Sequence, residues 1–171
     1  VLAAIGQSDN NYTTVALSRY VTAVASGKKY NYQLMNKIVD ADGKTVKKYK
    51  ADYEDISDTL TSSQWDAIHS GMREVVSTMD RFQGFDIPVA GKTGTAQITN
   101  NEPNHALFVS FAPYENPEIS ITVVIPNGFS SSNAAELASK VYQYYYDKSS
   151  RKKLMDGKVS SPAMGGTRQT D

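Results

Sequence analysis

The sequence predicts an α+β fold in which helices pack on an antiparallel sheet. Residues 106–112 and 119–125 are near-continuous apolar runs joined by a turn-forming cluster, which predicts two adjacent antiparallel strands. Three other stretches repeat apolar residues at helical spacing, so helices are available to cover both faces of the sheet. The chain has 171 residues, 40% of them hydrophobic, and therefore fits one domain or a large part of one.

The first predicted elements are a helix and a surface hairpin. Thr13 can cap the helix, which should end at Gly27. The apolar residues that recur along it at helical spacing are Leu17, Tyr20, Val21 and Val24. The β-prone runs 30–39 and 45–49 come next, and the Asp-Gly pair at 42–43 that joins them is a strong hairpin signal.

A second and a third helix are predicted further along. Thr61 followed by Gln64 makes a capping box for the second. Its apolar face holds Trp65, Ile68, Met72, Val75 and Val76. His69 lies within this helix, where we expect a surface or hydrogen-bonded histidine, and residues 80–86 are predicted to form a loop. Asn133 is predicted to cap the third helix. The apolar stripe predicted for that helix is Ala134, Leu137, Ala138, Val141, Tyr142 and Tyr145.

The most distinctive stretch lies between the second helix and the apolar strands. Pro88 cannot donate to a sheet ladder, so it suits a strand start, and residues 89–98 can then run extended. Gly91 and Gly94 lack a Cβ, which would let a ligand approach the backbone on both sides of Lys92 and Thr93. We therefore expect a ligand-facing sheet edge.

The chemistry of that edge indicates the kind of ligand. A strand edge offers N–H and C=O groups to a peptide laid alongside it. Lys92, Thr93 and Thr95 add positive charge and hydroxyl donors that suit an anion. The expected ligand is an extended, acidic peptide or a mimic of one.

Two other interpretations of this stretch compete. A three-residue K-T-G match is weak, so the lysine could be a solvated charge on an ordinary edge strand. A phosphate-binding P-loop ending at Gly91, Lys92 and Thr93 would need its first glycine where Asp86 stands. It would also need a helix after the lysine, whereas a glycine and a β-prone run follow, so the P-loop is rejected.

Ordered motifs give the stretch a family context. The run V-A-G-K-T-G-T-A-Q at 89–97 resembles the K-T-G strand of class B penicillin-binding proteins. The A-I-G-Q segment at 4–7 and the helix after Thr13 resemble that family's A-I-G-Q-G segment and T-P-x-Q-L-A helix. G-M-R-E-V-V at 71–76 resembles a recurrent helix end, and residues 105–113 resemble the next strand. The resemblance extends from about residue 2 to residue 146.

The resemblance implies a partial penicillin-binding and β-lactamase-like transpeptidase fold. Ser8, Thr14 and Ala16 depart from the family's residues, so that loop and helix start should be shaped differently. The family's S-x-x-K and S-x-N motifs precede A-I-G-Q, so residues 1–146 resemble the C-terminal portion of the domain. Residues 147–171 are rich in Lys, Ser, Gly and Thr without periodicity, and we expect a disordered tail there.

Several serines imitate catalytic motifs. Ser8-Asp9-Asn10 spells S-D-N, and Ser26, Ser149 and Ser150 each begin an S-x-x-K. A nucleophilic serine of this kind needs a helix N-terminus with the lysine one turn later on the same buried face. Ser26, Ser149 and Ser150 lack that context in the sequence, and Ser8-Asp9-Asn10 lies directly after Gln7, where the family has a loop. We therefore interpret all of them as coincidences.

By the same resemblance, the parent protein would be a serine-type D,D-transpeptidase that cross-links peptidoglycan. Lys92 would hold positive charge against the substrate carboxylate, and Thr93 and Thr95 would hydrogen-bond it. Gly94 would leave the backbone open to the ligand, and the backbone N–H of Thr95 would be one oxyanion-hole donor. The chain alone is expected to be inactive. The alternatives are a non-catalytic module that binds peptidoglycan or protein, and a β-lactamase-related protein.

Composition limits the partners. Eighteen basic and eighteen acidic residues balance, which disfavours nucleic acid and anionic membranes as partners. No cysteine and two isolated histidines predict no metal site, and no cofactor is expected. No apolar run is long enough to span a bilayer and no signal peptide is evident, so an exported parent would carry its anchor outside this chain. The resemblance implies an extracytoplasmic location, with peptidoglycan stem peptides, β-lactams and other cell-wall synthesis proteins as partners.

Overall fold

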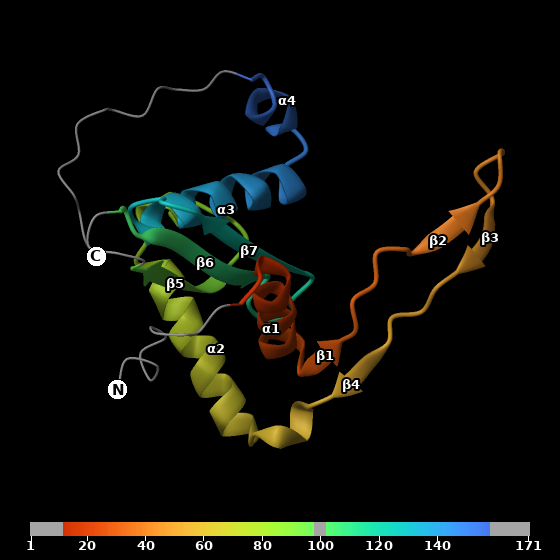
Figure 1. Cartoon of the computed structure of the whole chain (residues 1–171), viewed down its shortest axis with the longest axis horizontal. Helices are drawn as coiled ribbons and strands as arrows, with labels where there is room; N and C mark the ends of the chain where they lie inside the picture. Colours follow the sequence, from red (N-terminus) through yellow and green to blue (C-terminus); the bar gives the residue numbers. More distant parts are fainter. Residues whose placement is uncertain (1–11, 98–101, 158–171) are drawn as a thin grey trace.

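The computed structural model describes residues 12–97 and 102–157 (Figure 1). Its helices are α1 (Thr14–Ser26), α2 (Ser62–Ser77), α3 (Ser131–Tyr146) and α4 (Arg151–Leu154), with 3-10 turns η2 (Ser57–Thr59) and η3 (Asp80–Phe82). Its strands are β1 (Lys28–Tyr30), β2 (Lys37–Val39), β3 (Thr45–Lys48), β4 (Tyr53–Asp55), β5 (Ala90–Ala96), β6 (His105–Ala112) and β7 (Ile119–Ile125). No helix in these ranges combines the length and apolar character that crossing a membrane requires.

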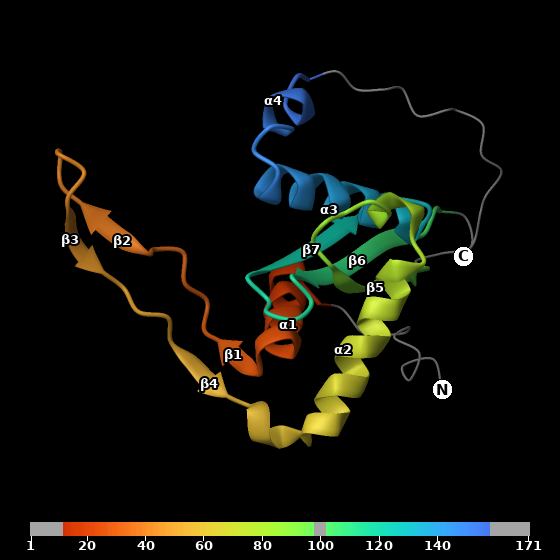
Figure 2. The same cartoon turned by 180° about the vertical axis from the view of Figure 1, so that it is seen from behind.

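A three-stranded antiparallel sheet in the order β5-β6-β7 forms the centre of the fold. Helix α3 lies on one face of the sheet and α1 on the other (Figures 1 and 2). The two apolar runs, now β6 and β7, are adjacent and antiparallel as predicted, with Phe108 opposite Val123. Cover on both faces explains why these strands lack a polar side.

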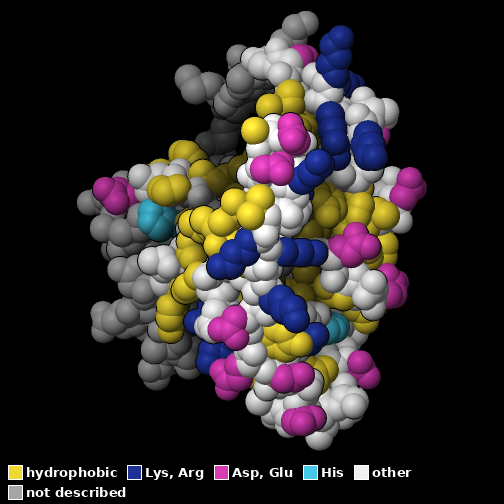
Figure 3. Space-filling model, turned by 90° about the vertical axis from the view of Figure 1, so that its right-hand side faces the viewer, with side chains coloured by type: hydrophobic (Ala, Val, Ile, Leu, Met, Phe, Trp, Pro, Cys, Tyr) yellow, Lys and Arg dark blue, Asp and Glu magenta, His cyan; other side chains and the backbone are white. Residues whose placement is uncertain are grey.

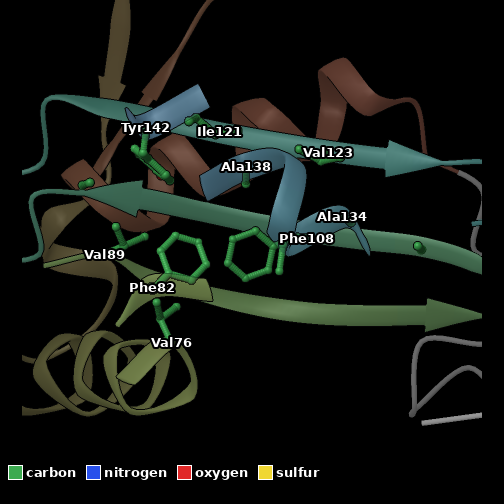
Figure 4. Close-up of a cluster of buried hydrophobic side chains, with 12 residues drawn as sticks. Val76, Phe82, Val89, Phe108, Ile121, Val123, Ala134, Ala138 and Tyr142 are labelled. Atoms are coloured by element: carbon green, nitrogen blue, oxygen red, sulfur yellow. The ribbon is translucent and has the colours of Figure 1, made fainter. Parts of the chain in front are cut away.

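The larger hydrophobic cluster fills the space between the sheet and α3 (Figure 4). Phe108 of β6 and Tyr142 of α3 are fully buried there, and the ring of Phe82 lies 5.9 Å from that of Phe108 between centroids. Residues 80–86 were predicted to be a loop. That prediction misses η3, because Phe82 is 8% exposed and belongs to this core.

A second cluster joins the opposite face of the sheet to α1. Val21 and Ala25 of α1 pack with Phe111 of β6 and Ala90 of β5. Thr13 caps α1 and Gly27 ends it in the left-handed region at φ 66°, as predicted. The capping box of Thr61 and Gln64 at the start of α2 is also confirmed.

Helix α3 differs from its prediction at both its start and its buried face. Ser130 is the N-cap, and Asn133 lies in the first turn, where its Nδ2 donates to the carbonyl of Gly128 at 2.8 Å. The residues of α3 that the structure buries are Ser131, Ala134, Ala135, Ala138, Ser139 and Tyr142. Three members of the predicted stripe are instead exposed, namely Leu137 (48%), Val141 (39%) and Tyr145 (46%).

The segment between α1 and α2 forms an arm that extends away from the sheet (Figure 1). Residues 30–39 were predicted to be one strand, but they divide between two ribbons. Strand β1 pairs with β4, whereas β2 pairs with β3 across the Asp-Gly turn. The hairpin prediction is therefore right for β2 and β3 and wrong for the residues nearer the helix.

The predicted tail begins with ordered structure. Arg151 of α4 donates from Nε to the carbonyl of Tyr144 at 2.7 Å, and its guanidinium lies 5.0 Å from the centroid of the Tyr144 ring. These contacts tie α4 to the end of α3, so the prediction of disorder is wrong for residues 147–157. Residues 158–171 lie outside the described part of the chain, and so does the Ser8-Asp9-Asn10 triplet.

Candidate substrate-binding strand

The predicted site residues lie on β5, which is one of the two edge strands of the central sheet in the described part of the chain. Its neighbour in the described part of the chain is β6, with Lys92 opposite Val109, Thr93 opposite Phe108 and Thr95 opposite Ala106. The expectation of a sheet edge is therefore confirmed. An edge strand can accept an extended peptide as an additional neighbour.

The register divides the polar side chains between the two faces of β5. Directly paired residues of an antiparallel ladder share a face, and successive residues alternate. Lys92 therefore shares a face with Val109, which packs in the cluster beneath α1. Thr93 shares the other face with Phe108, beneath α3. A ligand lying along the edge would meet the lysine from one side and the threonine from the other.

Lys92 is the exposed cation of this strand. Its ammonium group donates to the carbonyl oxygen of Thr93 at 2.8 Å, so the side chain folds back along its own backbone. Thr93, Gly94 and Thr95 are half-buried. An incoming carboxylate would compete with this carbonyl for the ammonium, and it would add an attraction between opposite charges that a neutral carbonyl lacks.

Gly91 serves packing, which corrects its predicted role. It is buried, and a Cβ there would lie 2.7 Å from Cζ of Phe108 and 2.8 Å from the carbonyl oxygen of Val109. The missing side chain therefore admits the Phe108 ring and not a ligand. At Gly94 a Cβ would meet Cβ of Leu107 at 3.4 Å, an ordinary contact, so only this glycine remains a candidate for ligand approach.

Arg73 and Pro88 hold the start of β5, and the sequence predicted Pro88 at this strand start but gave Arg73 no such role. Nη1 of Arg73 on α2 donates to the carbonyl of Val89 at 3.3 Å. The carbonyl of Pro88 accepts from the backbone N–H of Tyr114 at 2.8 Å. The sequence shows Arg73 only as a charged position on an amphipathic helix, because the target of its side chain depends on how α2 packs against β5.

The other polar candidates have structural roles. Nε2 of His69 lies 2.8 Å from the carbonyl of Val24 and so links α2 to α1, as expected of a hydrogen-bonded histidine. Oγ of Ser26 donates to the carbonyl of Thr22 at 2.7 Å at the end of α1, far from a helix N-terminus. Ser149 and Ser150 both donate to the carboxylate of Asp147, a turn that lowers the pKa of Asp147 to about 2.

A buried tyrosine and serine form a polar contact beneath α3. The hydroxyl of Tyr142 donates to Oγ of Ser110 at 3.0 Å, and Ser110 donates to the carbonyl of Ile121 at 3.3 Å. Burial raises the pKa of Tyr142 well above its ordinary value. This pair lies inside the core between helix and sheet, so it has no access to a ligand on the edge of β5.

The described residues also line a hollow of about 440 Å³ between α1, α2 and the base of the arm. Its walls are mostly apolar and include Val24, Trp65 and Ile68. The cations at its rim are engaged, since Lys29 pairs with Glu54 at 2.8 Å and Nε of Arg19 donates to the carbonyl of Tyr30 at 2.6 Å. The hollow contains none of the motif residues of β5. Nowhere in the described ranges do three or more potential metal ligands of the His, Cys, Asp and Glu kind gather.

The structure combines an antiparallel sheet between helices with a glycine-flanked lysine and threonines on the edge of that sheet. Comparisons with known proteins identify the family to which this arrangement belongs. The model of the penicillin binding protein transpeptidase domain matches residues 1–143. The chain belongs to this family, and it is of the class B kind.

Curated relatives support the assignment. Peptidoglycan D,D-transpeptidase MrdA of Haemophilus influenzae is 32% identical over 167 residues, which cover 85% of this chain and 25% of that protein. Penicillin-binding protein 2A of Bacillus subtilis is 28% identical over 171 residues, covering 86% of this chain and 24% of that protein. The chain thus spans about a quarter of the length of these relatives.

Solved structures agree with the fold. PBP2 of Helicobacter pylori matches with a TM-score of 0.61 at 27% identity over 85% of this chain and 27% of that one. The imipenem acyl-enzyme of penicillin-binding protein A from M. tuberculosis matches with a TM-score of 0.72 over 84% of this chain and 33% of that one. At 21% identity the second match supports the fold alone.

Proposed function

We propose that this chain is the part of a peptidoglycan D,D-transpeptidase that supplies the substrate-binding strand. The observation that carries the proposal is the placement of the K-T-G run on an edge strand, with Lys92 exposed, in a chain of this family. An extended stem peptide ending in a carboxylate suits such an edge. A β-lactam would enter as a mimic of that peptide end.

The proposed reaction is acyl transfer through a serine supplied by sequence preceding this chain. The serine attacks the carbonyl of the D-Ala-D-Ala bond, D-alanine leaves, and the amine of a second stem peptide takes the acyl group from the serine. Lys92 and the hydroxyls of Thr93 and Thr95 would hold the terminal carboxylate by charge-assisted hydrogen bonds. The backbone N–H of Thr95 would donate to the oxyanion, a contribution typically worth about 100- to 1000-fold in rate.

The location and partners of the parent protein follow from the same analogy. One structural neighbour, PBP2 of Helicobacter pylori, is known in complex with MreC. We propose that the parent of this chain acts on the extracytoplasmic side of a bacterial membrane, anchored by sequence outside this chain, and that it assembles with other cell-wall synthesis proteins.

Labelling with a fluorescent penicillin tests the proposal. The parent protein should be acylated and this chain alone should not, because the nucleophile is proposed to lie elsewhere. In the parent, Lys92→Ala should slow acylation by about 10- to 100-fold, the loss expected for one hydrogen bond to a charged group. Its melting temperature should stay unchanged, since Lys92 is exposed.

The matched control is Lys140→Ala, which removes an exposed lysine from α3 and should leave the acylation rate unaltered. Equal acylation rates for Lys92→Ala and the unaltered parent would show that Lys92 is a solvated surface charge with no role in acylation. A parent that takes no label at all would favour the non-catalytic binding module. Rapid release of the label as a hydrolysed penicillin would favour a β-lactamase.

A further inference from the structure

The outer part of the arm between α1 and α2, which consists of β2 and β3, does not pack against the rest of the molecule. Every residue of β2 and β3 is exposed, and neither strand contributes to the two hydrophobic clusters. The views from the front and the back both show this hairpin standing clear of the sheet and its helices (Figures 1 and 2). Packing in the hydrophobic core therefore does not account for the residues of this hairpin, and they are available for another role.

The arm is nonetheless held in a defined shape. At its base Lys29 pairs with Glu54 at 2.8 Å, and Nδ2 of Asn31 donates to the carboxylate of Asp52 at 2.7 Å. At its tip Oδ1 of Asp40 accepts from the backbone N–H of Lys44 at 2.8 Å. A surface ordered before binding loses less entropy when a partner docks.

The hairpin carries an excess of positive charge. Residues 37–50 contain five lysines and two aspartates, and both aspartates belong to the turn at the tip. Lys37 lies directly opposite Lys48, a like-charge arrangement that destabilises a hairpin. In the described ranges no acidic side chain forms an ion pair with any of these lysines. Lys and Arg side chains lie in the middle of this side of the molecule, with Asp and Glu side chains around them (Figure 3).

Apolar side chains and open backbone edges accompany the charge. Ile38, Val39 and Val46 are 42%, 44% and 68% exposed, and each lies within two positions of a lysine in its own strand. Strands β2 and β3 pair only with each other in the described chain, so each has an outer edge available for a further strand.

We propose that the β2–β3 hairpin is a docking site for an extended segment of a partner protein in which acidic and apolar residues alternate. The segment would add to the hairpin as a third strand, its carboxylates neutralising the Lys37 and Lys48 pair and its apolar side chains covering the exposed valines. An anionic bilayer fits less well, because the leading end of the arm carries Asp40 and Asp42. The proposal does not depend on the transpeptidase activity.

A fluorescently labelled peptide of alternating glutamate and valine is a suitable probe. Titration into the whole chain should give saturable binding, with backbone amide shifts in NMR spectra concentrated in residues 37–50. Lys37→Glu should weaken binding by about tenfold or more, since it removes a facing cation and adds an anion. The same variant should not lower the melting temperature, because it places a glutamate opposite Lys48.

Lys152→Glu on α4 is the matched control, because it makes the same charge change at another exposed lysine. It should alter peptide affinity by less than about twofold. Equal losses in both variants would mean that the peptide senses only net charge, which would overturn the site. Absence of saturable binding would also overturn it. So would tighter binding to phosphatidylglycerol vesicles than to the peptide with the same dependence on Lys37, which would assign the hairpin to a membrane surface.

Discussion

Single residues of β5 show how one motif combines a packing role with the proposed binding role. Lys92, Thr93 and Thr95 could be chosen as candidate binding residues from the sequence, because a cation and two hydroxyls are unusual in a strand beside apolar neighbours. The separate tasks of the two glycines could not be predicted. They depend on which residues of β6 lie against each glycine, and that register is a tertiary property.

Gly91→Ala tests the packing role of this glycine. The new Cβ would meet the carbonyl oxygen of Val109, which belongs to the paired strand and cannot turn away, as well as the Phe108 ring. We expect a loss of about 1–3 kcal/mol in the free energy of unfolding, the usual effect of overpacking a tight site. Urea unfolding of the chain measures it.

Gly94→Ala on the same strand is the control for that substitution. Its Cβ would lie 3.4 Å from Leu107, so the free energy of unfolding should fall by less than about 0.5 kcal/mol. Similar losses at both positions would show that a general requirement of the strand for glycine, and not contact with Phe108, determines the effect.

Helix α3 shows where the helical spacing of apolar residues fails to predict which face of an element is buried. Its apolar residues recur at helical spacing, and the prediction placed the large side chains of Leu137, Val141 and Tyr145 on the buried face. The structure buries Ala135 and Ser139 instead, because small residues let the helix approach β6 and β7 closely. Capping signals near the helix ends were more reliable, since Thr13, Thr61 and Gly27 act within their own turn.

Paired substitutions on α3 test this rotation of the buried face. Ala138→Leu should lower the free energy of unfolding by about 1–3 kcal/mol, because Ala138 is fully buried against the sheet and has no room for a larger side chain. Leu137→Ser, one position away, should cost less than about 1 kcal/mol because Leu137 is 48% exposed. If urea unfolding showed a larger loss for Leu137→Ser than for Ala138→Leu, the result would support the predicted apolar stripe and contradict the buried face seen in the structure.

At the scale of the whole molecule, the fold joins two hydrophobic clusters through one sheet and leaves the arm outside both. The sequence indicated the sheet, because long apolar strands joined by a turn leave few alternatives. It did not indicate the pairing of β1 with β4, which brings Lys28 opposite Asp55 across the intervening hairpin. Pairing between strands distant in sequence has no local signal, unlike the Asp-Gly turn of the hairpin.

Because of two tyrosines at the end of α3, we expect the free energy of unfolding of the whole domain to vary with pH in the alkaline range. Burial raises the pKa of Tyr142 well above its ordinary value and raises the pKa of Tyr146 to about 12. The native state therefore keeps both protons at pH values where the unfolded chain, with tyrosine pKa values near 10, begins to release them. This contribution is complete below about pH 10, and stability should fall as the pH rises above that value.

Two single substitutions separate the tyrosines, and their effects at neutral pH should have opposite signs. Tyr142→Phe removes the hydrogen bond to Ser110 and should lower the free energy of unfolding by about 1 kcal/mol. The hydroxyl of Tyr146 is buried with no hydrogen-bond partner in the described structure, so Tyr146→Phe should raise the free energy of unfolding by about 1 kcal/mol. Each variant should also lose less stability between about pH 9 and pH 11 than the unaltered chain, because one shifted proton is gone. If urea unfolding gave the same sign for both at neutral pH, or left the alkaline loss unchanged, then the environments of these hydroxyl groups would not control the stability of the domain.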